Sequence, residues 1–162
     1  TVLENVLLSE KFSINTKKSQ NDKEQQINKA KQLLQQVGLA DKAALLPQQL
    51  SGGMRQRVAL ARTLMQEKPI VLMDEPFSAL DAVTRYRLQN LACELLKDKT
   101  VVLITHDPQE AIRLADRLYI MQGNPAFAEQ LTLPTTATPR NSDAQSATLQ
   151  QTIIERLEVD YE

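Results

Sequence analysis

Apolar residues recur at helical spacing in the first part of the chain. Residues 1–46 are rich in Lys, Gln and Asn, and five apolar positions among them repeat every three or four residues: Ile27, Ala30, Leu33, Leu34 and Val37. Gly38 follows them, and glycine is common directly after a helix. We therefore predict a mainly helical subdomain over residues 1–49.

After residue 50 the pattern changes to short apolar runs separated by amphipathic stretches. The runs lie at residues 70–73, 101–104 and 118–121, and each is continuous, as is typical of strands buried on both faces of a parallel sheet. The first two are separated by leucines at helical spacing, which are Leu88, Leu91, Leu95 and Leu96. This alternation predicts βαβ units and an α/β fold class for residues 50–122.

Helix-capping residues and a change in residue composition indicate the remaining elements. The spacing of Ser78 and Asp81 resembles a capping box at a helix start, and Asp107 precedes a first-turn proline and an acidic residue. From residue 123 the chain becomes rich in Thr and Pro, and a helix is predicted over residues 144–157. We interpret residues 123–162 as an appended tail.

Composition and charge narrow the function classes. The chain has 162 residues, 42% of them hydrophobic, and a formal net charge of -1, so it lacks the basic surplus typical of nucleic-acid binding. Cys93 is the single cysteine, which fits a reducing compartment. No apolar run is long enough to cross a bilayer, and residues 1–10 do not resemble a signal peptide. We expect a cytoplasmic chain.

Polar side chains follow the first two predicted strands where each strand ends. Asp74 and Glu75 follow the first, and Thr105, His106 and Asp107 follow the second. Parallel strands joined by a crossover helix place their carboxyl ends on one rim of the sheet, where α/β proteins bind ligands. Each residue also has a plain structural interpretation, as a solvated acid or a structural histidine. Together they indicate a site.

The chemistry of these groups is suited to phosphoryl transfer. A carboxylate at the strand end, Asp74, can hold Mg²⁺ through water, and the next carboxylate, Glu75, can orient or deprotonate an attacking water. His106 can contact a terminal phosphate.

A second candidate anion site lies at residues 51–53. Gly52 and Gly53 let the backbone approach an anion closely, Ser51 adds a hydroxyl, and the following helix directs its amide groups to the same place. The alternative is that Ser51 only caps a helix and the glycines form a turn.

These residues resemble the ATP-binding subunits of ABC transporters. Residues 50–54 are similar to the signature motif, with Met54 where Gln is commonest, and residues 70–76 to the Walker B strand with its catalytic glutamate. Residues 78–81 resemble the D-loop and residues 105–107 the switch-histidine loop. The resemblance covers residues 1 to about 121 and implies part of a P-loop NTPase (RecA-like) parallel sheet with a helical subdomain.

The resemblance implies ATP and Mg²⁺ as cofactors and assigns the site residues. Asp74 would hold the metal, Glu75 would polarise the attacking water, and His106 would contact the γ-phosphate. The residues expected to bind the ATP of a second, identical subunit or to couple the two sites are Ser51, Gly52, Gly53 and Asp81. Further implied partners are transmembrane permease subunits and, indirectly, a solute-binding protein, with no nucleic acid. The implied location is peripheral, on the cytoplasmic face of the bacterial plasma membrane.

One family motif is missing from the chain. None of the four glycines precedes a lysine, so the 162 residues contain no glycine-rich P-loop. We expect an N-terminally truncated sequence whose isolated fragment is inactive and binds nucleotide weakly. The signature continuation, residues 74–81 and the Pro139-Arg140 segment resemble importers of nitrate, sulfonates, taurine and pyrimidine precursors. Among such solutes we favour a thiamine precursor or another small organic nutrient.

Two other function classes compete with a transport ATPase. One is a naturally short, non-catalytic module that dimerises with a complete ATPase subunit, and the retained Glu75 argues against it. The other is a DNA-repair or chromosome ATPase, which would need coiled-coil heptads and a basic surface that the chain lacks.

Overall fold

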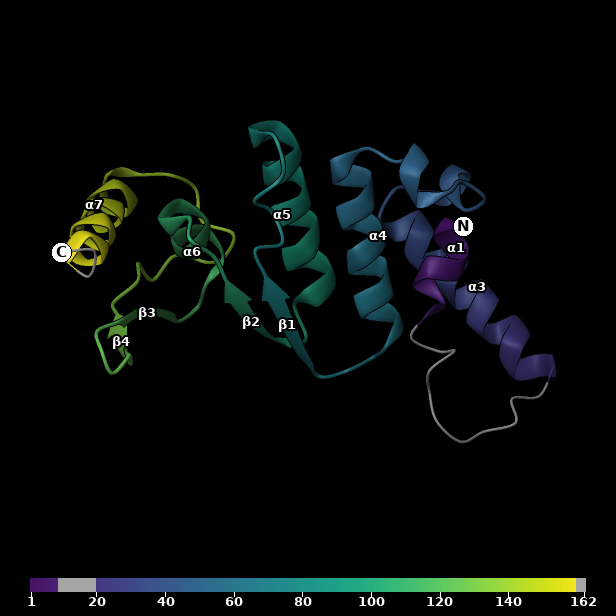
Figure 1. Ribbon diagram of the computed structural model, residues 1–162, viewed down its shortest axis with the longest axis horizontal. Helices are drawn as coiled ribbons and strands as arrows, with labels where there is room; N and C mark the ends of the chain where they lie inside the picture. The colour runs from purple at the N-terminus through teal and green to yellow at the C-terminus, as the bar shows by residue number, and fades with distance from the viewer. Residues whose placement is uncertain (9–19, 160–162) are drawn as a thin grey trace. The chain divides into compact units, whose positions relative to one another are not determined.

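The structure is a computed structural model that describes residues 1–8 and 20–159 (Figure 1). Residues 9–19 of the predicted helical subdomain and 160–162 of the predicted tail lie outside the described residues. The chain divides into two compact units, the first made of residues 1–71 and 76–101 and the second of 72–75 and 102–162.

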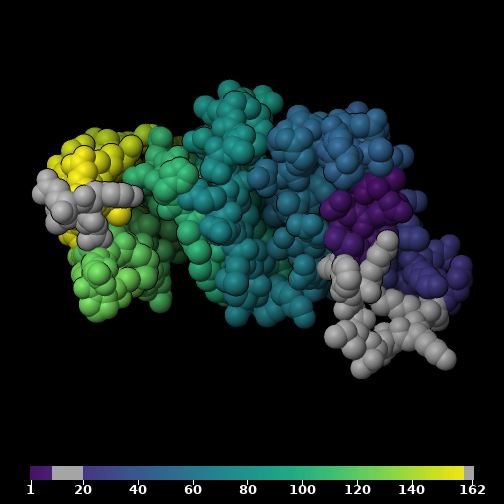
Figure 2. All heavy atoms as spheres, in the orientation of Figure 1, coloured from purple at the N-terminus to yellow at the C-terminus, as the bar shows by residue number. Residues whose placement is uncertain are grey.

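The first unit is built mainly of helices. They are α1 (Val2–Val6), α3 (Gln20–Gln36), α4 (Gly52–Met65) and α5 (Ala82–Leu96), with short 3₁₀ turns at Ala40–Lys42 and Pro47–Gln49. α1 packs against α3 and α4, and α4 also packs against α3 and α5 (Figure 2, where the purple atoms of α1 adjoin the blue atoms that follow α3). Helical packing around α4 therefore forms the core of this unit.

The predicted helix before Gly38 is confirmed as α3. Ala30 and Leu34 are fully buried on its inner face, and Val37 is buried directly after it. Gly38 has a φ of +71°, a left-handed conformation that glycine adopts without steric cost, and this ends the helix.

The predicted βαβ unit is present. β1 (Ile70–Asp74) and β2 (Thr100–Ile104) pair with each other, and α5 lies between them in sequence. Thr100 N–H donates to the Pro69 carbonyl at one end, and Glu75 N–H donates to the Ile104 carbonyl at the other. Both chains therefore advance in the same direction, and the pair is parallel.

The third predicted strand does not join the parallel sheet. β3 (Leu118–Gln122) pairs antiparallel with β4 (Phe127–Leu131) in a separate two-stranded sheet. Four residues connect β3 and β4, so the hairpin closes at a small entropic cost. Burial on both strand faces was also predicted wrongly for the first two runs, since Leu72 and Ile104 are 77% and 60% exposed.

The second unit joins the tail to the helix that follows His106. This helix, α6 (Pro108–Leu114), packs against α7 (Ala144–Val159). One core unites α6, the hairpin and α7, and its buried members are Ile112, Leu118, Ile120, Leu131 and Ile153. The predicted tail helix is confirmed as α7, but the description of the tail as an appendage is wrong, because these apolar side chains share one core. In the described ranges, every helix is too short or too polar to cross a bilayer.

Candidate functional site

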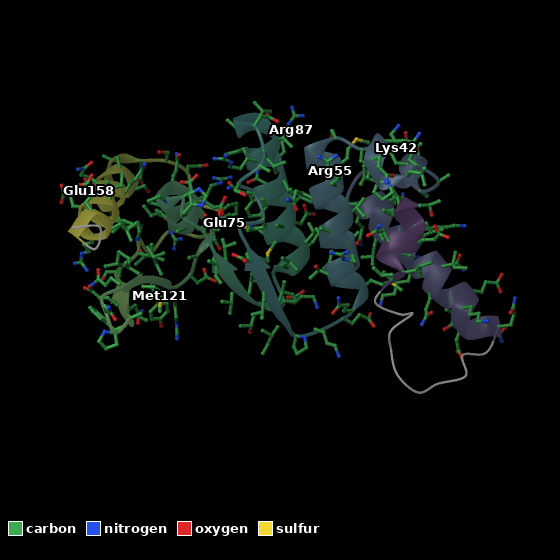
Figure 3. The ribbon with its side chains drawn as sticks, viewed as in Figure 1. Lys42, Arg55, Glu75, Arg87, Met121 and Glu158 are labelled. Atoms are coloured by element: carbon green, nitrogen blue, oxygen red, sulfur yellow. The ribbon has the colours of Figure 1, made fainter. Side chains whose placement is uncertain are left out.

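Glu75 and His106 lie in direct contact within the second unit. Glu75 Oε1 accepts a hydrogen bond from the His106 backbone N–H at 2.8 Å and lies 2.6 Å from His106 Nδ1 (Glu75 is labelled in Figure 3). The carboxylate therefore fixes both the backbone and the ring of His106. With Nδ1 facing Glu75, Nε2 is the ring nitrogen left for another group, and the His106 side chain is 77% exposed.

The backbone around this contact is shaped by both strand ends. Glu75 has a φ of +46°, which is unfavourable for a residue with a Cβ, and its N–H is held by the Ile104 carbonyl. The Thr105 hydroxyl accepts from the Asp107 N–H at 3.1 Å. Asp107 caps α6 by accepting from the N–H groups of its first turn, as its position before a proline predicts. The left-handed residue at position 75 has no signal in the sequence.

Asp74 is the last residue of β1 and is exposed. In residues 1–8 and 20–159, no three His, Cys, Asp or Glu side chains are grouped as a metal site. Mg²⁺ keeps several waters and is often held by one or two carboxylates together with substrate phosphates. Asp74 therefore fits a magnesium ion that it holds through water, and the ion's own ligands would be water and phosphate oxygens.

Ser51, Gly52 and Gly53 form the start of α4 in the first unit. Ser51 is the N-cap, and its hydroxyl accepts from the Met54 N–H at 3.3 Å. The structural interpretation of the serine as a cap is thus correct. A cap and an anion site do not exclude each other, since the first-turn amide groups of a helix lack carbonyl partners within the helix.

Asp81 is the N-cap of α5, and its carboxylate accepts from the Thr84 N–H at 3.0 Å. The predicted capping box beginning at Ser78 is wrong, because the N-cap lies three residues later, at Asp81, and the helix begins at Ala82. Hydrogen bonding to Thr84, by its side chain and its backbone N–H, lowers the pKa of Asp81 below its ordinary value of 3.8. Asp81 is therefore held in its charged form by the helix that it caps.

The starts of α4 and α5 are in contact. A Cβ at Gly53 would lie 2.5 Å from Thr84 Cγ2, closer than side chains pack, whereas a Cβ at Gly52 would meet no atom nearer than 3.8 Å. A glycine at position 53 is therefore needed to let the start of α5 approach the start of α4. The sequence motifs mark both segments, but no pattern identifies Thr84 as the residue between them.

Two arginines reinforce these starts and were not predicted to do so. Arg55 Nη1 donates to the Leu50 carbonyl at 2.6 Å, and Arg85 Nη2 donates to the Leu80 carbonyl at 3.1 Å. Both carbonyls precede a capping residue. The only available sequence signal is the repeated spacing of four residues from the cap to the arginine.

The comparisons with known proteins agree with this arrangement. A family model described as ABC transporter matches residues 1–78. An uncharacterized ABC transporter ATP-binding protein of Haemophilus influenzae is 51% identical over 80% of this chain and 55% of its own length. An aliphatic sulfonates import ATP-binding protein of Xanthomonas axonopodis is 48% identical over 76% of this chain and 50% of its own length. The chain thus spans about half the length of these relatives.

Solved structures show the same likeness. The inward-facing conformation of a metal-chelate type ABC transporter matches 80% of this chain and 52% of that chain, with a TM-score of 0.68 and 29% identity. An ATP-binding cassette in its ADP conformation matches 74% of this chain and 50% of that chain, with a TM-score of 0.63 and 25% identity. In sequence and in fold, the chain is thus similar to ABC transporter ATP-binding proteins over about half of their length.

Proposed function

We propose that the whole protein is an ATPase subunit of a bacterial importer and that aliphatic sulfonates are its solute class. The contact of 2.6 Å between Glu75 and His106, directly after two paired parallel strands, carries the proposal. Phosphoryl transfer to water needs a carboxylate that orients the water and a donor that stabilises the phosphate, and these two residues supply both types of group. The sulfonate class comes from the name of the Xanthomonas relative.

Each proposed site residue has a role that its position supports. Glu75 orients and polarises the attacking water, and it also holds the His106 ring so that Nε2 can face a γ-phosphate. Asp74 holds Mg²⁺ through a water ligand, and the ion when bound stabilises charge on the phosphate oxygens. Three residues at the capped start of α4 contact the phosphate of an ATP held by a second subunit, and these are Ser51, Gly52 and Gly53. Asp81 couples the two sites.

The proposed assembly contains two identical ATP-binding subunits and a pair of membrane permease subunits on the cytoplasmic face of the plasma membrane. A solute-binding protein delivers the solute to the permease. The proposed organisation of the chain is a helical subdomain over residues 1–49, the C-terminal part of the ATPase core over 50–122 and a tail over 123–162. Because the 162 residues contain no P-loop, nucleotide binding by this chain alone is expected to be weak.

A chimera tests the proposed function. Residues 1–121 of this chain would replace the matching half of the Xanthomonas relative, which contributes the remainder of the subunit. We expect the purified chimera to hydrolyse ATP, and we expect it to restore growth on an alkanesulfonate as the sulfur source in cells lacking their own sulfonate ATP-binding subunit. Glu75→Gln should abolish both, whereas the exposed Arg87→Met should change neither.

ATP hydrolysis tests the proposed reaction, and growth on the alkanesulfonate tests the proposed solute class. Hydrolysis by the chimera that survives Glu75→Gln would contradict the role of Glu75. Hydrolysis without growth on the alkanesulfonate would contradict the sulfonate assignment alone. Tight binding of ATP to the 162-residue chain in a calorimetric titration would contradict the expected dependence on a P-loop.

A further inference from the structure

Arg140 is a buried arginine whose guanidinium is bonded to main-chain carbonyls. It is 6% exposed and lies between the end of β4 and the start of α7. Its Nη1 donates to the carbonyls of Ile112 and Ala115 at 3.0 and 2.6 Å, and its Nε and Nη2 both donate to the Pro134 carbonyl. One side chain thus connects the tail to the last turn of α6.

The backbone of Arg140 continues the same connection. Its N–H donates to the Arg113 carbonyl at 2.8 Å, and the Arg113 guanidinium donates back to the Arg140 carbonyl. The last carbonyls of a helix have no partners within the helix, and a positive charge beside them is favourable. Arg140 satisfies three carbonyls of this helix end, at residues 112, 113 and 115.

The other end of α6 begins directly after His106. Asp107 caps it by accepting from Gln109 and Glu110, and His106 itself is held by Glu75. A seven-residue helix is only about 10 Å long and is not stable by itself. Its position therefore depends on what holds its two ends, and a shift at the Arg140 end changes the direction in which the first turn presents His106.

We propose that Arg140 is a positioning residue for His106. By closing the C-terminal end of α6 against the tail, it keeps the helix in the place where the His106 ring meets Glu75. The catalytic importance of this placement rests on the proposed function, but the placement itself does not. The tail after residue 131 then helps to orient the histidine. The position favours arginine because its side chain makes four hydrogen bonds from three nitrogens, whereas lysine has three N–H groups on a single nitrogen.

His106 is the only histidine of the chain, so its ring gives a single, unambiguous signal in a ¹H–¹³C spectrum of the 162-residue protein. Glu75→Ala provides the reference for a ring that has lost its partner. Arg140→Met and Arg140→Lys test the proposal, and the exposed Arg117→Met is the matched control. Ile153→Val loosens the same core but removes no hydrogen bond from the end of α6, so it controls for simple destabilisation.

We expect both Arg140 variants to move the chemical shift of the His106 ring at least half of the way to its value in Glu75→Ala. The amide chemical shifts of the β3–β4 hairpin should remain those of the folded protein. Arg117→Met and Ile153→Val should leave the His106 signal in place, even if Ile153→Val lowers the melting temperature. No nucleotide is present, so failure of ATP hydrolysis in the chimera has no bearing on this result.

Three outcomes would overturn the proposal. The first is a His106 signal that is unchanged in a folded Arg140→Met variant. The second is an equal movement in Ile153→Val, which would assign the effect to general loosening. The third is global unfolding of both Arg140→Met and Arg140→Lys, which would make Arg140 a residue of the fold without a specific effect on the histidine.

Discussion

Arg55 and Arg85 occupy equivalent positions in two helices that pack against each other. Each follows the capping residue of its helix by four positions, and each guanidinium donates to the carbonyl just before that cap. Each backbone N–H also donates to the carbonyl of its capping residue, Ser51 or Asp81. The starts of α4 and α5 are therefore built on the same plan, and the arginines hold the loops that enter them (Arg55 is labelled in Figure 3).

Removing either guanidinium should loosen a helix start. We expect Arg55→Met and Arg85→Met each to lower the free energy of unfolding by about 1 kcal/mol, since each loses a charge-assisted hydrogen bond at a partly buried site. Urea denaturation followed by circular dichroism measures the change. Arg87→Met, at an exposed position of α5, is the control and should stay within about 0.5 kcal/mol of the parent. Equal effects at 85 and 87 would contradict the role of the hydrogen bond.

Gly53 should not tolerate a methyl group. Gly53→Ala places a Cβ 2.5 Å from Thr84 Cγ2, and a β-branched side chain in a helix has little rotational freedom to move away. We expect a loss of about 1–3 kcal/mol in the free energy of unfolding, as for other overpacked sites. Gly52→Ala is the matched control, because its Cβ has room, and it should be neutral or slightly stabilising.

A second substitution can restore the space at Gly53. Thr84→Ser removes Cγ2 but keeps the hydroxyl that interacts with Asp81. The double variant Gly53→Ala with Thr84→Ser should therefore recover most of the stability that Gly53→Ala loses. Additive effects of the two substitutions in the same denaturation experiment would mean that Thr84 is not what excludes a side chain at position 53.

The left-handed backbone at Glu75 predicts that glycine is more stable than alanine at this position, which is the reverse of their order inside a helix. Both Glu75→Gly and Glu75→Ala remove the carboxylate, so they differ in backbone strain at a φ of +46°. We expect Glu75→Gly to be more stable by about 1 kcal/mol. The same pair at Arg87, inside α5, should show the opposite order, because glycine is unfavourable in a helix. If the glycine and alanine variants had the same order of stability at positions 75 and 87, the proposed backbone strain at Glu75 would be contradicted.

Asp81 should contribute to loss of stability in acid. Its pKa is lowered in the folded chain, so the unfolded chain binds more protons, and stability falls as the pH drops through its ordinary pKa of 3.8 and below the folded value. Asp81→Asn caps a helix about as well but does not titrate. We expect equal stability near pH 7 and a weaker acid dependence in the variant. The measurement is the free energy of unfolding of both proteins between pH 7 and about pH 2. An equal decrease in the parent and in Asp81→Asn would contradict this.

Local patterns predicted local structure well. Gly38 ends α3, Asp107 caps α6, and the apolar runs at 70–73 and 101–104 form paired strands because nearby residues determine each of these features. The cap of α5 was placed three residues too early, at Ser78 instead of Asp81, because the spacing of Ser78 and Asp81 satisfies the same capping pattern as a true start.

Several features that depend on distant partners were not predictable. The run at 118–121 has the composition of a buried parallel strand, but its partner is β4, and pairing is decided by the segment that can reach it. The role of Arg140 depends on carbonyls about 25 residues away, and no periodicity marks a carbonyl as unpaired. At the candidate site, residue types predicted Glu75 and His106 correctly as neighbours, but not the left-handed backbone that joins them.

The division of the chain into interleaved units has a consequence during synthesis. Residues 72–75 belong with residues after 101, so the ribosome produces them before the rest of their unit exists. Glu75 precedes His106 by 31 residues, and at about 5–20 residues per second it waits about 2 to 6 s for its partner. Arg140 emerges later still. The newborn chain can complete α4 and α5 early, whereas the carboxylate–histidine pair must wait for His106 and the Arg140 contacts for residue 140.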